Sequence, residues 1–161
     1  MLKPTLQALV LADNVYQDKV TGKIIIAGTF NRLIFTKPAE SGSEKQSNAE
    51  LNIDGQRQMA WHEVHRSGSP SVYISLTNAR GSIPLELRYV DLLDNTVLFA
   101  VKFTVKFEDP LKTIEAIVPV PPLPTPHAGV YTLELLCGDE PLGAHRIAAV
   151  DSSKAPEAEE K

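Results

Sequence analysis

The sequence has few of the residues that would build a redox, nucleic-acid-binding or membrane-embedded protein. It contains one cysteine, Cys137, in 161 positions, so no intrachain disulfide can form. Lysine and arginine number 16 against 20 aspartate and glutamate residues, and this net charge of −4 gives no cationic excess for nucleic acid or an anionic membrane. No apolar run reaches the roughly 18 residues of a membrane-spanning helix. We therefore expect neither nucleic acid nor membrane as a partner.

The length and composition suit one globular domain, which we place at residues 1–150. Cys137 stands in the apolar row of a predicted strand, so we expect a buried small side chain rather than a nucleophile. A single unpaired cysteine fits a reducing compartment, and the expected location is cytoplasmic. The first apolar segment, Leu6–Ala12, is interrupted by Gln7 and is too short for a signal sequence. It is predicted to be a strand that ends at Asp13-Asn14.

Alternation of apolar and polar residues predicts strands through most of the chain. The clearest run extends from Val97 to Phe107, where every second residue is apolar, and this row is predicted to belong to the core. The segment Lys23–Phe35 is rich in β-branched residues and predicts one long, bent strand, with Gly28 marking a bulge. Eight or nine such strands, without a convincing amphipathic helix, predict an all-β fold, an antiparallel β-sandwich.

The stretch 119–150 leaves the fewest conformations open, and it reads PVPPLPTPHAGVYTLELLCGDEPLGAHRIAAV. Its first half has five prolines, which fix φ and remove backbone donors, so it predicts an extended connector. A strand beginning near Gly129 and a turn at Gly138-Asp139 follow, which predicts a closing hairpin. The spacing around Tyr131 resembles the tyrosine corner of immunoglobulin-like sandwiches, in which a tyrosine hydroxyl bonds back to the loop that enters its strand. We therefore expect the sandwich to be immunoglobulin-like.

Two polar segments are predicted to lie outside the packed strands. Residues 36–58 are dominated by Ser, Glu, Lys, Gln, Asn and Gly, and are predicted to be a flexible loop, an insertion rather than a functional element. Residues 151–161 are polar and mainly acidic, and are predicted to be a disordered tail. Between the loop and the next strand, Met59–Arg66 contains the only tryptophan, Trp61, in what reads as a short strand.

No pattern in the chain predicts a catalytic or metal centre, and we expect no cofactor. His62 and His65 are three residues apart in a predicted strand and would point to opposite faces, unlike zinc-binding histidines on a helix. His127 and His145 are expected to be structural, hydrogen-bonded histidines. Acidic residues gather in turns, where their usual role is to cap the turn, although converging loops would make a calcium site or a carboxylate pair. These residues are Asp13, Asp18, Asp91, Asp94, Glu108 and Asp109.

Three segments together resemble a family of bacterial proteins known only as a domain of unknown function. They are LQALVLADNVYQDKVTGKIIIAGTFN near the start, SVYISLTNARGSIPLELRYVDLLDN in the middle and PVPPLPTPHAGVYTLELLCGDEPLGAHRI at the end. The resemblance extends to about Val150. It implies a compact β-sandwich and no known activity, cofactor or catalytic residue.

These observations predict a non-enzymatic protein-interaction or structural module, with a protein partner or self-association through an exposed strand edge or the neighbourhood of Trp61. The alternative is a small-ligand or carbohydrate-binding module in which Trp61, Tyr73 and Tyr89 serve as stacking faces if they are exposed. An enzyme that uses the turn carboxylates is a third hypothesis, which requires two of them within catalytic reach.

Overall fold

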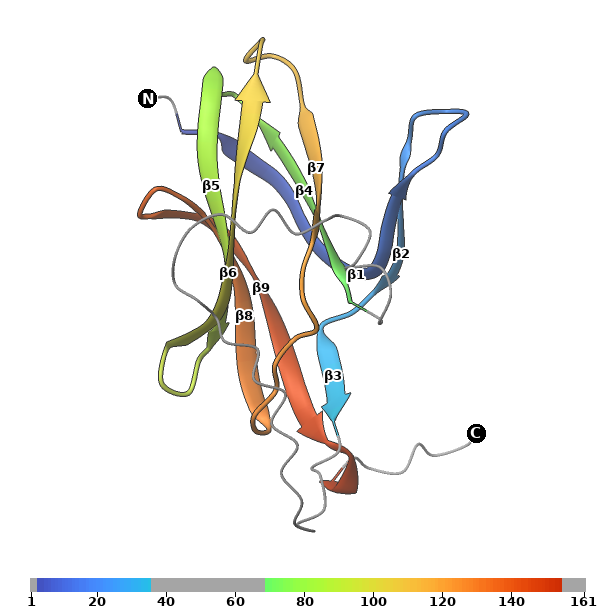
Figure 1. Ribbon diagram of the computed structural model, residues 1–161, viewed down its shortest axis with the longest axis vertical. Helices are drawn as coiled ribbons and strands as arrows, with labels where there is room; N and C mark the ends of the chain where they lie inside the picture. The colour runs from blue at the N-terminus through green and yellow to red at the C-terminus, as the bar shows by residue number, and fades with distance from the viewer. Residues whose placement is uncertain (1–2, 36–68, 155–161) are drawn as a thin grey trace.

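The computed structural model describes residues 3–35 and 69–154, and within them the protein is a β-sandwich of two sheets (Figure 1). This confirms the predicted all-β class and strand number. One sheet has four strands, in the order β2 (Ile24–Thr29), β1 (Thr5–Gln17), β4 (Ser71–Thr77) and β7 (Ile114–Pro119). The other has five, in the order β3 (Arg32–Phe35), β9 (Glu140–Asp151), β8 (Gly129–Cys137), β5 (Gly81–Asp91) and β6 (Thr96–Phe107). All neighbouring strands are antiparallel except β3 and β9, which are parallel.

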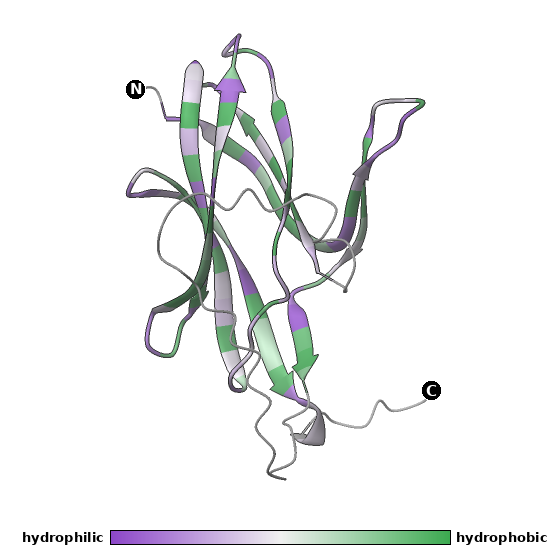
Figure 2. Cartoon of the chain, viewed as in Figure 1, coloured by the Kyte–Doolittle hydropathy of each residue, from purple (hydrophilic) through white to green (hydrophobic). Residues whose placement is uncertain are grey.

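The core lies between the two sheets and is formed by the apolar rows that alternation predicts. Figure 2 shows this alternation of hydrophobic and hydrophilic residues along most strands. Alternate residues in the central parts of β4, β5 and β8 are fully or almost fully buried, because successive side chains of a strand point to opposite faces. Cys137, at the end of the β8 row, is only partly buried, so the prediction of a buried side chain is wrong for it. The central members are Val72, Ile74, Leu76, Ile83, Leu85, Leu87, Leu133 and Leu135.

The row along β6 is only partly core, which corrects the prediction for its first half. Phe107 is buried at one end, but Val97 at the other is 47% exposed, and Phe103 between them is half-buried. β6 is the outer strand of its sheet, so only part of its inner face is covered. The pairing with β5 also shifts register near Leu98, which changes the direction of the side chains at the start of the strand.

The connector and the closing hairpin follow the prediction. β7 ends at Pro119, and the chain then runs without a strand to Gly129, anchored by Val120, whose amide donates to the Pro70 carbonyl (3.1 Å). The Tyr131 hydroxyl donates to the His127 carbonyl (2.8 Å) and accepts from the His127 amide (3.3 Å). This is the bond expected of a tyrosine corner, and it confirms the prediction for this residue.

The N-terminal strands differ from the prediction in two ways. β1 does not end at Asp13-Asn14 but continues to Gln17, and the predicted long strand over Lys23–Phe35 is two strands, β2 and β3, which belong to different sheets. Gly28 adopts a φ of 73° just before the chain crosses between the sheets. The positive φ favours glycine there, and a side chain at Gly28 would also displace the Asp13 carboxylate on the neighbouring strand.

Of the two polar segments, only the first four residues of the C-terminal one are described. β9 continues to Asp151, and Ser152–Lys154 forms a turn of 3₁₀ helix, so the first residues of the predicted tail have regular structure. The rest of that tail and the predicted loop over 36–58 lie outside the described residues.

Candidate functional site

The segment that stands out from the sandwich is a β-hairpin formed by the second half of β1 and by β2, which we call the hairpin arm (residues 13–29). β1 pairs with β4 along Thr5–Ala12, whereas it pairs with β2 along Ala12–Gln17. β4 therefore pairs with the first half of β1, and β2 pairs with the second half. Figure 1 shows the consequence, because the arm leans away from the body of the sandwich and its tip lies far from β4 and β7.

The tip of the hairpin arm is held by a network around one carboxylate. Asp18 accepts hydrogen bonds from the Val20 amide (3.2 Å), the Thr21 amide (3.1 Å) and the Thr21 hydroxyl. The Thr21 hydroxyl, followed by the two amides, lowers the pKa of Asp18. Gly22 supplies the positive φ of 70° that the turn needs, and the Gln17 side-chain amide donates to its carbonyl (2.9 Å). The turn is therefore well specified even though it lies outside the core.

One face of the hairpin arm exposes apolar side chains. Tyr16 and Ile25 are directly opposite each other across the two strands and are 52% and 38% exposed. Val20 at the tip is almost completely exposed, and Val15, on the opposite face, is buried. A two-stranded hairpin is marginally stable on its own in water, because it has little apolar surface to bury. The Tyr16–Ile25 pair and Val20 therefore leave apolar surface of the arm in contact with solvent.

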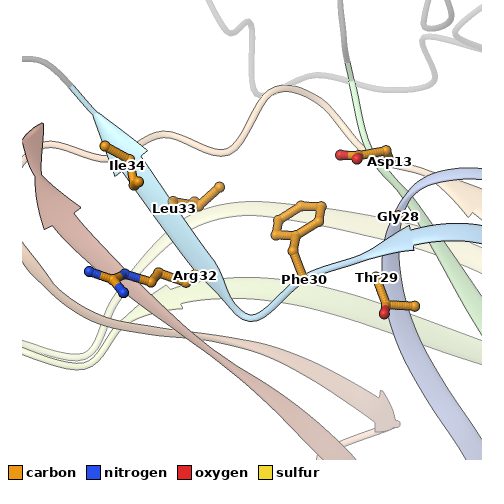
Figure 3. Close-up of a pocket in the computed structure, with 7 residues that line it drawn as sticks. All are labelled: Asp13, Gly28, Thr29, Phe30, Arg32, Leu33 and Ile34. Carbon is orange, nitrogen blue, oxygen red and sulfur yellow. The ribbon is translucent and has the colours of Figure 1, made fainter. Parts of the chain in front are cut away.

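The base of the hairpin arm contains a shallow hollow of about 280 Å³ (Figure 3). Asp13 lies at one side of it, beside Gly28, and Arg32 lies at the other side, with the Phe30 ring between them. Figure 3 shows the Arg32 guanidinium pointing away from the Asp13 carboxylate. The two charged groups therefore do not converge on one ligand position, and the hollow favours a contact surface over a small-molecule site.

The three aromatic residues predicted as stacking faces do not form a site among the described residues. Trp61 lies outside them. Tyr73 is half-buried on β4, and its hydroxyl donates to Glu115 on the neighbouring β7. Desolvation, and then this hydrogen bond, raise the pKa of Tyr73.

Tyr89 is fully buried, so the prediction of a stacking face is wrong for this residue. Its ring stacks on Phe99 (5.3 Å between centroids) and Tyr131 (5.4 Å) inside the sandwich. The alternation of β5 already put Tyr89 in the same row as Ile83, and this was the signal for its burial. Desolvation raises the pKa of Tyr89 well above its usual value. The carbohydrate-binding alternative loses one of its three residues.

A long-range polar contact joins Asp91 at the end of β5 to His127 in the connector, 36 residues later. His127 Nε2 lies 2.5 Å from Asp91 Oδ2, and Nδ1 lies 3.0 Å from the Ala128 carbonyl oxygen. Because both neighbours of the ring accept hydrogen bonds, they favour the doubly protonated imidazolium. The Ala128 carbonyl, followed by Asp91, raises the pKa of His127.

Asp91 and His127 are residue types that form catalytic dyads, but here neither ring nitrogen of His127 is free to contact a substrate. Both nitrogens of His127 are occupied, and Asp91 also accepts from the Leu93 amide (2.9 Å). A general base needs one ring nitrogen directed at a substrate or nucleophile. The geometry instead clamps the connector to the turn between β5 and β6. His145 likewise bonds the Phe30 carbonyl (3.1 Å), which supports the structural roles predicted for both histidines.

The turn carboxylates do not converge. Asp94 lies in the β5–β6 turn and Asp109 in the β6–β7 turn, and the whole length of β6 separates them (Figure 1). Asp18 is at the tip of the hairpin arm. Within residues 3–35 and 69–154, no three His, Cys, Asp or Glu side chains are close enough to hold a metal ion. The same residues contain no helix that could span a membrane.

Comparison with known proteins adds no assignment. No protein-family model matches the chain, and no curated protein matches it. The family resemblance drawn from the three sequence segments therefore stays a prediction.

Proposed function

We propose that this protein is a non-enzymatic interaction module built on an immunoglobulin-like sandwich, and that the hairpin arm is the surface through which it contacts another protein. The strand order supports the immunoglobulin-like type. Immunoglobulin domains name their strands by letters, and β9-β8-β5-β6 matches the order G-F-C-C′ of one immunoglobulin sheet, with β3 parallel to β9 at its edge. The facing strands β1-β4-β7 match the order A-B-E of the other sheet. The tyrosine corner at Tyr131 supports it independently.

The exposed Tyr16–Ile25 pair on the hairpin arm carries the proposal. It is apolar, it stands on two strands with little packing of their own, and it projects from the body where a partner has access (Figure 1). Tyrosine is enriched at protein interfaces because its ring gives a large contact area and its hydroxyl a hydrogen bond. The absence of a converging polar group at the hollow beside the arm favours a protein over a small ligand.

Co-purification with arm variants tests the proposal. The tagged chain and the double variant Tyr16→Lys/Ile25→Lys are used as baits in lysate of the source organism, and the bound proteins are compared by quantitative mass spectrometry. The control is Leu93→Lys, because Leu93 is 78% exposed in the turn between β5 and β6 and does not line the hollow beside the arm. We expect a partner, or the untagged chain itself, to be recovered by the wild type and the control and lost from the double variant. Equal recovery by all three baits contradicts the assignment to the arm.

A further inference from the structure

The outer strands of the two sheets differ in how they are protected from pairing with another chain. β6 carries Lys102 and Lys106, β3 has only four residues and carries Arg32, and β7 carries Glu115 and ends in proline. Charges, prolines and short length are the usual devices that stop a sheet edge from adding a foreign strand. β2 has the sequence IIIAGT and, among the four outer strands of the described sheets, is the one without any of these devices.

The backbone of β2 presents its free hydrogen-bonding groups at two isoleucines. The Asp18 amide donates to the Lys23 carbonyl (2.8 Å), so these two residues form a hydrogen-bonded pair at the end of the hairpin. In an antiparallel ladder, hydrogen-bonded residues alternate with residues whose amide and carbonyl point away from the partner strand. Ile25 is therefore directed towards β1, and Ile24 and Ile26 direct their amides and carbonyls outwards.

We propose that the partner of the hairpin arm is a second copy of this chain, which pairs with it through β2 in antiparallel orientation about a two-fold axis at Ile25. This rests on the proposed function and names the partner. Ile24 of one copy then lies opposite Ile26 of the other, and the outward amides and carbonyls of both strands are satisfied. Such an isologous contact needs a self-complementary strand, and three consecutive isoleucines supply one.

The side chains support the same register. With Ile25 opposite Ile25 of the second copy, the two exposed cross-strand pairs form one continuous apolar row, with Tyr16 at each end. Lys23 lies opposite Ala27 of the second copy, so no like charges meet. The two four-stranded sheets join into one, and the hairpin arm gains the additional strands that a stable sheet requires.

Sedimentation equilibrium on the purified full-length chain tests the pairing. We expect the wild type to reach twice its 17.6 kDa chain mass as concentration rises. Ile26→Pro removes an outward amide without removing a bond to β1, and Ile25→Lys places two positive charges at the axis. Each is expected to weaken the dimer at least tenfold, whereas the controls Ile26→Val and Leu93→Lys leave it unchanged. A wild type of single-chain mass throughout, or a dimer equally strong in Ile26→Pro, overturns the proposal.

Disulfide trapping keeps the test independent of variant folding. In a Cys137→Ser background, Ile25→Cys puts one thiol of each copy at the axis, where side chains of a non-hydrogen-bonded pair are close enough to bridge. We expect covalent dimers under mild oxidation for Ile25→Cys and none for Leu93→Cys, at an exposed position in the β5–β6 turn. If Ile25→Cys forms no cross-linked dimer, the proposal that the partner is a second copy of this chain is wrong. If the arm then still recovers a different protein from lysate, the proposed function stands, and if it recovers none, both fail.

Discussion

The body of the sandwich and the hairpin arm use the same strand chemistry with opposite results. In the body, Leu133 and its neighbours are fully enclosed between two sheets. In the arm, Tyr16 and Ile25 form an equally regular cross-strand pair, but one face of the arm is left exposed. The difference arises because β1 is longer than β4, its partner in the body, and its second half pairs with β2 alone. Stability should therefore reside in the body, and recognition in the arm.

The largest effect is expected in the body. Leu133→Ala removes a completely buried side chain and should lower the free energy of unfolding by about 2–5 kcal/mol. Chemical denaturation monitored by circular dichroism measures it. A loss no greater than that of an arm substitution would break the distinction between the two regions.

The second-largest loss of stability is expected from a change at the tyrosine corner. Tyr131→Phe keeps the ring in the core but removes the hydroxyl that bonds the amide and carbonyl of His127, and should cost about 1–3 kcal/mol. Urea unfolding of the variant gives the value. Tyr73→Phe is the control, since it makes the same chemical change at a hydroxyl that bonds the Glu115 side chain and not the connector. Equal effects of the two substitutions would show that the corner has no special part in holding the connector.

The junction of body and arm should respond to a change at Gly28. Gly28→Ala places a Cβ against the Asp13 carboxylate and forces a positive φ on a non-glycine residue, at a cost of about 1–2 kcal/mol. Gly138→Ala is the matched control, because Gly138 also has a positive φ but no atom lies near its Cβ position. Hydrogen exchange should show faster exchange in the arm for Gly28→Ala alone. Unchanged exchange there would mean that the arm does not depend on this junction.

The His127 clamp predicts a pH dependence in the body. Because the folded-state pKa of His127 is raised by the Ala128 carbonyl and by Asp91, protonation stabilises the folded protein. This contribution is fully present below the unfolded pKa of about 6.5 and is lost as the pH rises through the folded pKa. The melting temperature of the wild type should exceed that of His127→Gln by more at pH 5.5 than at pH 9. A melting-temperature difference between wild type and His127→Gln that grows towards alkaline pH would contradict this prediction.

The smallest effect on stability is expected on the arm itself. Ile25→Ala should lower the free energy of unfolding of the monomer by less than about 1 kcal/mol, since the side chain is partly exposed and contributes one cross-strand pair with Tyr16. Unfolding at protein concentrations too low for dimer formation measures the effect on the monomer alone. A loss comparable with that of Leu133→Ala would place the arm in the cooperative core.

Much of the body follows from local sequence. Alternation identified the buried rows of β4, β5 and β8, and the spacing before Tyr131 predicted its bond to the entering loop. Both signals are short-range, since a strand's period and a bond across four residues are encoded within one segment.

The arm and the clamp depend on long-range pairing, and sequence patterns alone did not locate them. Asp13-Asn14 reads as a turn, but the register with β2 continues the strand through it. Which sheet each half of Lys23–Phe35 joins is set by β1 and by β9, not by its own residues. Nothing local connects Asp91 with His127, because the contact forms only when the connector folds over the β5–β6 turn.

The most direct test of the arm as an interaction surface is residue-resolved amide exchange at rising protein concentration. The Ile26 amide points outwards from β2 and the Ile25 amide towards β1, so neighbouring residues serve as probe and internal control. If β2 pairs with a second copy, protection of the Ile26 amide increases with concentration, whereas protection of the Ile25 amide is already present in the dilute monomer. Fast exchange of Ile26 at every concentration would contradict this pairing.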